Sequence, residues 1–98
     1  MELHVFSWDD AKNKLNKSKH GISFETAKYV FDDPYQITRQ DRVVNGEQRW
    51  QTIGLTGDVE LVLVAHTWQE LENGEDLIRI ISARHATKLE RAIYEQNP

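Results

Sequence analysis

The segment Asp76–Thr87 constrains the fold most strongly, because it is an apolar run interrupted by two arginines. Its leucine and isoleucine content is typical of a buried β-strand. Side chains alternate across a strand, so Arg79 is expected on the face of Ala83, and Arg84 on the other face unless a β-bulge re-aims it. A guanidinium stays charged and is costly to bury alone. The two arginines are therefore either paired structural ions or part of a site that meets an anion.

Capping residues predict two short helices near the start of the chain. Asp9 is a suitable N-cap for a helix that ends at Gly21, and Ser23 caps a second helix that ends at Asp33–Pro34. A short strand over residues 5–8 would precede both. The second helix would bury a stripe of apolar residues, Phe24, Ala27, Val30 and Phe31.

The rest of the chain predicts an antiparallel meander followed by a helix. Three strands are expected over residues 35–42, 47–55 and 59–67. Asn45–Gly46 is a hairpin turn, a polar loop over 68–75 leads to the arginine strand, and Thr87–Glu90 is a capping box. The predicted fold is α+β, a single domain over residues 1–98. Two N-terminal helices would pack on an antiparallel sheet of about four strands, with a C-terminal helix.

The composition narrows the function classes. The chain contains no cysteine, so disulfides and thiolate chemistry are excluded, and a cytoplasmic location is expected. No signal peptide and no apolar stretch of ~20 residues is visible, so no membrane association is predicted. The net charge of −4 is unpromising for a nucleic-acid binder, but four carboxylates gather in residues 70–76. The rest of the chain is neutral and can still form a local basic surface.

No metal or cofactor site is predicted. The four histidines include no close pair at ligand spacing, and cysteine ligands are absent. The sequence also has no glycine-rich phosphate loop and no nucleophile elbow. Any chemistry would therefore rest on ionisable side chains.

His66 is the most informative histidine, because it ends the apolar strand over residues 59–67, on the face of Val62 and Val64, and should lie next to the arginine strand. It is either a packed structural residue or a group with a pKa near ~6.5 that moves protons while the arginines hold a phosphate.

Other polar and aromatic residues also have two interpretations. Glu47 and Arg49 share one face of a strand, as a solvated ion pair or as the edge of a site. Lys19 and His20 end the first helix, where the helix dipole favours cations in any case. Three tryptophans could be core residues or platforms for base stacking, namely Trp8, Trp50 and Trp68.

Together these residues suit a metal-free site on the sheet. Cleavage of RNA by its own 2′-hydroxyl needs a base, cations for the phosphorane charge and an acid for the leaving oxygen. A plain anion-binding surface would need only the cations. Both interpretations stay open on the residues alone.

Several segments, in this order, resemble the BrnT toxins of bacterial type II toxin–antitoxin systems. They cover nearly the whole chain: Phe6–Asp9, Lys19–Glu25, Val30–Pro34, Gly46–Arg49, Ile53–Gly54, Leu63–Thr67, Arg79–Arg84 and Glu90–Arg91 before Tyr94. The ordered set is far more specific than any one segment.

The resemblance implies a RelE-like fold and a ribonuclease toxin that inhibits translation by cutting RNA. It also implies a cognate BrnA-like ribbon-helix-helix antitoxin, through which alone the toxin meets operator DNA. The family motif positions fall on Lys19, His20, Glu47, Arg49, His66, Arg79 and Arg84. On chemical grounds we expect Arg79 and Arg84 to bind phosphate and His66 to transfer protons. The acidic segment leaves an alternative, a catalytically silent module that binds an antitoxin or acidic partner through its arginine face.

Overall fold

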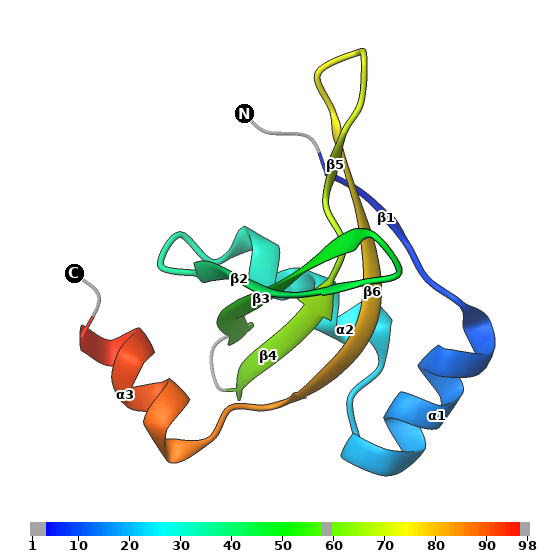
Figure 1. Ribbon diagram of the computed structural model, residues 1–98. Helices are drawn as coiled ribbons and strands as arrows, with labels where there is room; N and C mark the ends of the chain where they lie inside the picture. The colour runs from blue at the N-terminus through cyan, green and yellow to red at the C-terminus, as the bar shows by residue number, and fades with distance from the viewer. Residues whose placement is uncertain (1–3, 58–59, 97–98) are drawn as a thin grey trace.

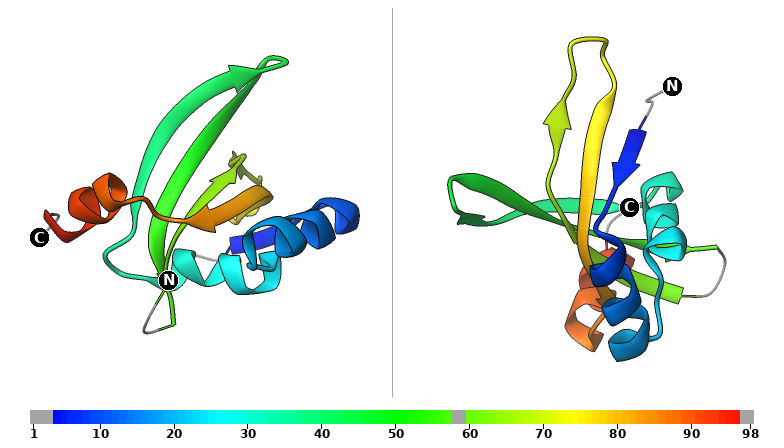
Figure 2. Two further views of the ribbon diagram at one scale, coloured as in Figure 1. Left: turned by 90° about the horizontal axis from the view of Figure 1, so that it is seen from below. Right: turned by 90° about the vertical axis from the view of Figure 1, so that its right-hand side faces the viewer.

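The structure is a computed structural model that describes residues 4–57 and 60–96. Its elements follow one another as β1 (His4–Ser7), α1 (Asp10–His20), α2 (Phe24–Ala27), the 3₁₀-helix η1 (Lys28–Asp32), β2 (Ile37–Val44), β3 (Glu47–Thr56), β4 (Glu60–His66), β5 (Gln69–Glu70), β6 (Asp76–His85) and α3 (Lys88–Gln96). None of the described helices is long and apolar enough to cross a membrane. Figure 1 shows α1 and α3 at opposite ends of the sheet, and Figure 2 shows the same separation from below.

The sheet confirms the α+β class but has six strands rather than the predicted four. Its order is β1-β6-β4-β3-β2, with β5 paired to β6. The meander β2–β3–β4–β6 is antiparallel as predicted, whereas β1 joins it in parallel, with Ser7 opposite Arg79. The predicted loop 68–75 contains β5, so the acidic segment forms a hairpin that projects from the sheet (Figure 1). A two-residue strand is too short to leave a pattern in the sequence.

The helix caps are those that the sequence predicts. The Asp9 carboxylate accepts a hydrogen bond from the Lys12 backbone N–H, and Gly21 ends α1 in the left-handed conformation that glycine tolerates best. Ser23 caps α2 through the Thr26 N–H. The chain then tightens into η1 instead of continuing as an α-helix. Thr87 and Glu90 hydrogen-bond each other's backbone N–H groups, so the predicted capping box opens α3.

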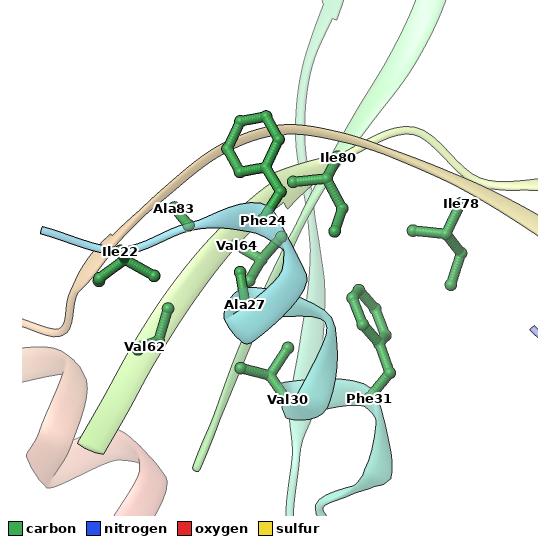
Figure 3. Close-up of a cluster of buried hydrophobic side chains, with 10 residues drawn as sticks. All are labelled: Ile22, Phe24, Ala27, Val30, Phe31, Val62, Val64, Ile78, Ile80 and Ala83. Carbon is green, nitrogen blue, oxygen red and sulfur yellow. The ribbon is translucent and has the colours of Figure 1, made fainter. Parts of the chain in front are cut away.

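Two apolar clusters lie on opposite faces of the sheet. The larger cluster packs α2 and η1 against β4 and β6, and Figure 3 shows Phe31 of η1 directed towards Ile78 of β6. The smaller one joins Ile53, Leu61 and Leu63 to Tyr94 of α3. On α3, Leu89 is 72% exposed and lies outside both clusters.

Candidate functional site

A β-bulge places Arg79 and Arg84 on the same face of the sheet. His66 pairs with Ile80 and Ala65 pairs with Ser82, so Ile81 is the extra residue in β6. Ile78, Ile80 and Ala83 are all buried in the larger cluster as a result. The expectation that Arg79 shares a face with Ala83 is therefore wrong, because the bulge reverses the alternation after Ile80. Both arginines point to the face opposite that cluster.

Arg79 lies in a polar groove of about 370 Å³, here called the arginine groove. Its wall comes from the start of α1, the β2–β3 hairpin and β6, and its lining residues are Asp9, Lys12, Val44, Asn45, Glu47, Arg49, Arg79, Ile80 and Ile81. The hairpin turn Asn45–Gly46 brings Glu47 and Arg49 of β3 to this face. Three of the four charged residues that the sequence predicts from β3 and β6, namely Glu47, Arg49 and Arg79, therefore meet in one place.

Glu47 and Arg79 form the central ion pair of the groove. Arg79 Nη2 donates to Glu47 Oε1 over 2.6 Å, and the two side chains are 48% and 49% exposed. Arg49 differs, because its Nε is buried and has no hydrogen-bond partner among the described residues. A buried guanidinium N–H without an acceptor is unfavourable. Arg49 also lines the arginine groove, so its guanidinium group can contribute positive charge to an anion bound there.

Asn16 fixes α1 beside β6. Strand β1 pairs with β6 only as far as Arg79, which leaves the next part of that edge open. There the buried Asn16 side chain makes the backbone hydrogen bonds that a neighbouring strand would make. Its Nδ2 donates to the Ala83 carbonyl over 2.9 Å, and its Oδ1 accepts from the Ala83 N–H over 3.0 Å. Lys12 consequently reaches the arginine groove.

Lys19 and His20 lie farther along α1, against a neighbouring cavity of about 480 Å³. This cavity shares Lys12 and Ile81 with the arginine groove. Lys12, Lys19 and His20 therefore lie along the same side of the molecule as Arg79, whereas Lys14 and Lys17 line a different pocket. Lys12 was not among the predicted site residues, although its seven-residue spacing from Lys19 places both on one side of a helix.

Arg84 is a paired ion, not the free phosphate ligand that the sequence suggests. Its two terminal nitrogens donate to both oxygens of Glu90, over 2.7 and 2.9 Å. Arg39 of β2 lies 3.6 Å from the same carboxylate. The Glu90 side chain is only 10% exposed, whereas that of Arg84 is 39% exposed. Arg84 therefore joins β6 to α3, and of the two arginines only Arg79 lines the arginine groove.

The pairing gives folding a specific acid dependence. The hydrogen bonds from Arg84 outweigh burial and lower the pKa of Glu90 from 4.5 to about 2. A carboxylate with a lowered folded-state pKa stabilises the fold above its unfolded pKa and loses that contribution as the pH falls towards the folded value. The contribution is at most about 3 kcal/mol.

Between pH 5 and pH 2, the wild type should therefore lose more free energy of unfolding than Glu90→Gln, as urea denaturation would measure. Equal losses in the two proteins would contradict this role for Glu90.

His66 lies next to the arginine strand, as expected, but on the face opposite the arginines. It is 1% exposed, and its ring stacks edge-on against Phe31 with centroids 5.0 Å apart. Nδ1 lies 2.9 Å from the Thr67 carbonyl and Nε2 lies 2.7 Å from Thr52 Oγ1. Burial lowers the pKa of His66, so its ring is neutral at pH 7. The structure thus does not bring His66 together with Arg79 and Arg84 in one site.

Comparison with known protein families identifies the family of the chain. The family model described as "Ribonuclease toxin, BrnT, of type II toxin-antitoxin system" matches residues 8–90. The chain belongs to the BrnT family. Comparison with curated protein sequences finds no significant match.

A solved structure agrees with this assignment at the level of the fold. The chain is similar to the crystal structure of the ribonuclease toxin BrnT from Brucella abortus, with a TM-score of 0.57 and 19% identity. The match covers 88% of this chain and 99% of that one. The BrnT fold is thereby confirmed, while the RelE-like label stays a prediction. Within residues 4–57 and 60–96, no three His, Asp or Glu side chains are grouped so that they could hold a metal ion.

Proposed function

We propose that this BrnT-family chain cleaves RNA in the arginine groove by a metal-independent reaction. The observation that carries the proposal is the Glu47–Arg79 pair in a groove that Arg49 also lines. A carboxylate that can accept a proton and guanidinium groups that can bind a phosphate are what attack by a 2′-hydroxyl needs. Lys12 adds a third cation from α1.

The reaction follows from the positions of these groups. Arg79 and Arg49 hold the non-bridging oxygens of the phosphate, and Arg79 also orients the carboxylate of Glu47. Glu47 takes the proton of the 2′-hydroxyl as its oxygen bonds to phosphorus. The bond to the 5′-oxygen breaks, and Lys12 supplies the proton for that oxygen. The products are a 2′,3′-cyclic phosphate and a 5′-hydroxyl. His66 takes no part, because both of its ring nitrogens are engaged on the opposite face.

The test of this reaction compares two substrates in the presence of EDTA. Single-stranded RNA should be cut to fragments with 2′,3′-cyclic phosphate and 5′-hydroxyl ends. The same RNA with a 2′-deoxy nucleotide at the cut position should resist cleavage there, because the attacking hydroxyl is missing. Glu47→Gln should slow cleavage by about 10²-fold or more, the usual share of a positioned base. A need for divalent ions, or fragments with 3′-hydroxyl ends, would contradict the mechanism.

The family also suggests the cellular setting. We infer that the chain acts in the cytoplasm, inhibits translation through RNA cleavage, and is neutralised by a BrnA-like ribbon-helix-helix antitoxin. Operator DNA would be met only through that antitoxin. The second candidate is a catalytically silent module that binds an antitoxin or acidic partner through its arginine face. It is favoured by the acidity of the chain, a net charge of −4 with an acidic hairpin on the strand that carries Arg79, because this charge would weaken RNA binding.

The acidic hairpin should weaken RNA binding through repulsion. Glu70 pairs with Asp76, three residues from Arg79, which is ~10 Å along the strand. This distance is close to the Debye length of ~8 Å at physiological salt and well within that of ~30 Å at 0.01 M. Replacing Glu70 and Glu72 with glutamine should therefore strengthen RNA binding, most at low salt.

The matched control replaces Glu60 and Glu95, two exposed carboxylates on β4 and α3, with glutamine. It removes the same number of charges outside the hairpin. Filter binding at two salt concentrations would compare the variants. An equal gain in both would show that net charge, rather than the position of the hairpin, limits affinity.

A further inference from the structure

A second pocket lies between η1 and the sheet face opposite the arginine groove. It has a volume of about 110 Å³, and we call it the Thr38 pocket. Its lining residues are His4, Phe31, Gln36, Thr38, His66, Trp68 and Ile78. No step of the proposed reaction uses these side chains.

A chain of hydrogen bonds fixes what Thr38 offers to this pocket. His66 Nδ1 faces the Thr67 carbonyl, which can only accept, so Nδ1 carries the proton and Nε2 of the neutral ring accepts. Thr52 therefore donates to Nε2 over 2.7 Å. Because the single hydroxyl proton of Thr52 is already donated to His66, Thr38 Oγ1 must donate to Thr52 Oγ1 over 2.8 Å. The exposed Thr38 hydroxyl is left with lone pairs only.

Gln36 presents the same polarity. Its Nε2 donates to the carbonyls of Phe31 and Asp33, over 2.8 and 3.2 Å. Both partners can only accept, so the amide nitrogen must face them and Oε1 points elsewhere. Thr38 and Gln36 thus both offer acceptors. A ligand that matches these two side chains has to bring N–H donors.

The walls and the size of the pocket select a single flat ring. Phe31 and the 46% exposed Trp68 are aromatic, and Trp50 supports Trp68 edge-on with ring centroids 5.3 Å apart. Aromatic side chains of this kind are the usual platforms for unstacked bases of single-stranded RNA. The volume of about 110 Å³ is less than a third of the roughly 370 Å³ of the arginine groove, which favours one six-membered ring over a fused pair.

We propose that the Thr38 pocket binds cytosine in single-stranded RNA, through the exocyclic amino group of the base. The inference rests on the proposed ribonuclease function and adds a base preference to it. Cytosine is a single ring, and its amino group has two hydrogens for the acceptors of Thr38 and Gln36. Uracil has the same size but carries a carbonyl in that position, which would face two acceptors. Because the pocket and the arginine groove lie on opposite faces, the cytosine is a different nucleotide from the one that is cut.

The test titrates nucleosides, which have no phosphate, into ¹⁵N-labelled protein. The Gln36 side-chain amide and the Trp68 indole report on the pocket. Cytidine should bind saturably and about tenfold or more tightly than uridine, because a site built for a hydrogen bond rejects the analogue that lacks it. Thr38→Val should remove this preference while keeping the shape of the side chain. Thr56→Val on β3 is the matched control and should retain it.

Arg79→Ala separates this inference from the ribonuclease proposal. It should abolish cleavage and leave cytidine binding unchanged. Equal binding of cytidine and uridine, or no saturable shift up to millimolar nucleoside, would overturn the inference without touching the arginine groove. Displacement of cytidine by the guanidinium compound N-acetyl-arginine amide, at equal or lower concentration, would also overturn it. That result would mark the pocket as one for a partner's arginine.

Discussion

Arg79→Ala is expected to lower the rate of RNA cleavage by about 10²- to 10³-fold, the usual effect of removing one donor that stabilises transition-state charge. Arg79 is the cation that both orients Glu47 and faces the groove. Its ion pair with Glu47 is half exposed, and such pairs contribute at most about 1 kcal/mol to stability. The variant should therefore melt close to the wild type. Single-turnover cleavage in EDTA and a thermal melt measure the two effects.

Arg91→Ala is the matched control for this experiment. Arg91 is an exposed arginine on α3, at the other end of the sheet from α1 (Figure 1). The Arg91→Ala variant loses the same charge as Arg79→Ala and should cut RNA at nearly the wild-type rate. If Arg91→Ala slowed cleavage as much as Arg79→Ala, the effect would come from overall charge and the groove would lose its special role.

Ile80→Ala is expected to cost about 2–5 kcal/mol of folding free energy, the typical cost of emptying a buried aliphatic position. Ile80 of β6 is 1% exposed, lies in the larger cluster and pairs with His66 of β4. For a domain of this size each kcal/mol shifts the melting temperature by about 4–8 °C. The melting temperature should therefore fall by ~10 °C or more. Val43→Ala, at a 60% exposed valine of β2, is the control and should change it little.

The melting temperature of Arg84→Ala should lie between those of Ile80→Ala and Val43→Ala. A solvated phosphate ligand at the end of a strand, as the sequence suggests for Arg84, would contribute little to stability. The structure changes this expectation, since truncation leaves the buried Glu90 carboxylate without its bidentate partner. Removing one partner of a fully buried pair costs ~3–5 kcal/mol, and the partial exposure of Arg84 reduces that figure. A melting temperature unchanged from the wild type would show that Arg39 alone can hold Glu90.

Local signals in the sequence predicted the helices and most of the sheet. Asp9, Gly21, Ser23 and the Thr87–Glu90 capping box act on neighbouring backbone groups, so their effects can be inferred from a few residues. The stripe Phe24, Ala27, Val30 and Phe31 is wholly buried, as its spacing predicted. Strand β1 was expected one residue later, and its parallel pairing with β6 depends on contacts between distant segments.

The site was harder to predict because it depends on one inserted residue and on distant partners. The bulge at Ile81 decides which face Arg84 occupies, and no residue type in β6 marks it. Glu90 was recognised as a capping residue, but its bond to Arg84 requires knowing where α3 returns. His66 was placed correctly on the face of Val62 and Val64. What the sequence could not show was that Arg79 and Arg84 share the other face.

The most direct measurement of the central claim is a map of where RNA binds. A 2′-O-methylated hexamer of uridines cannot be cut and lacks the amino group proposed for the Thr38 pocket. Titrated into ¹⁵N-labelled protein, it should shift the backbone signals of the groove residues Lys12, Asn45, Glu47, Arg49, Arg79 and Ile81. Arg79→Ala should weaken these shifts. If instead the shifts were confined to α3 or to the surface around Tyr29 and Tyr35, the arginine groove would not be the RNA site of this BrnT-family protein.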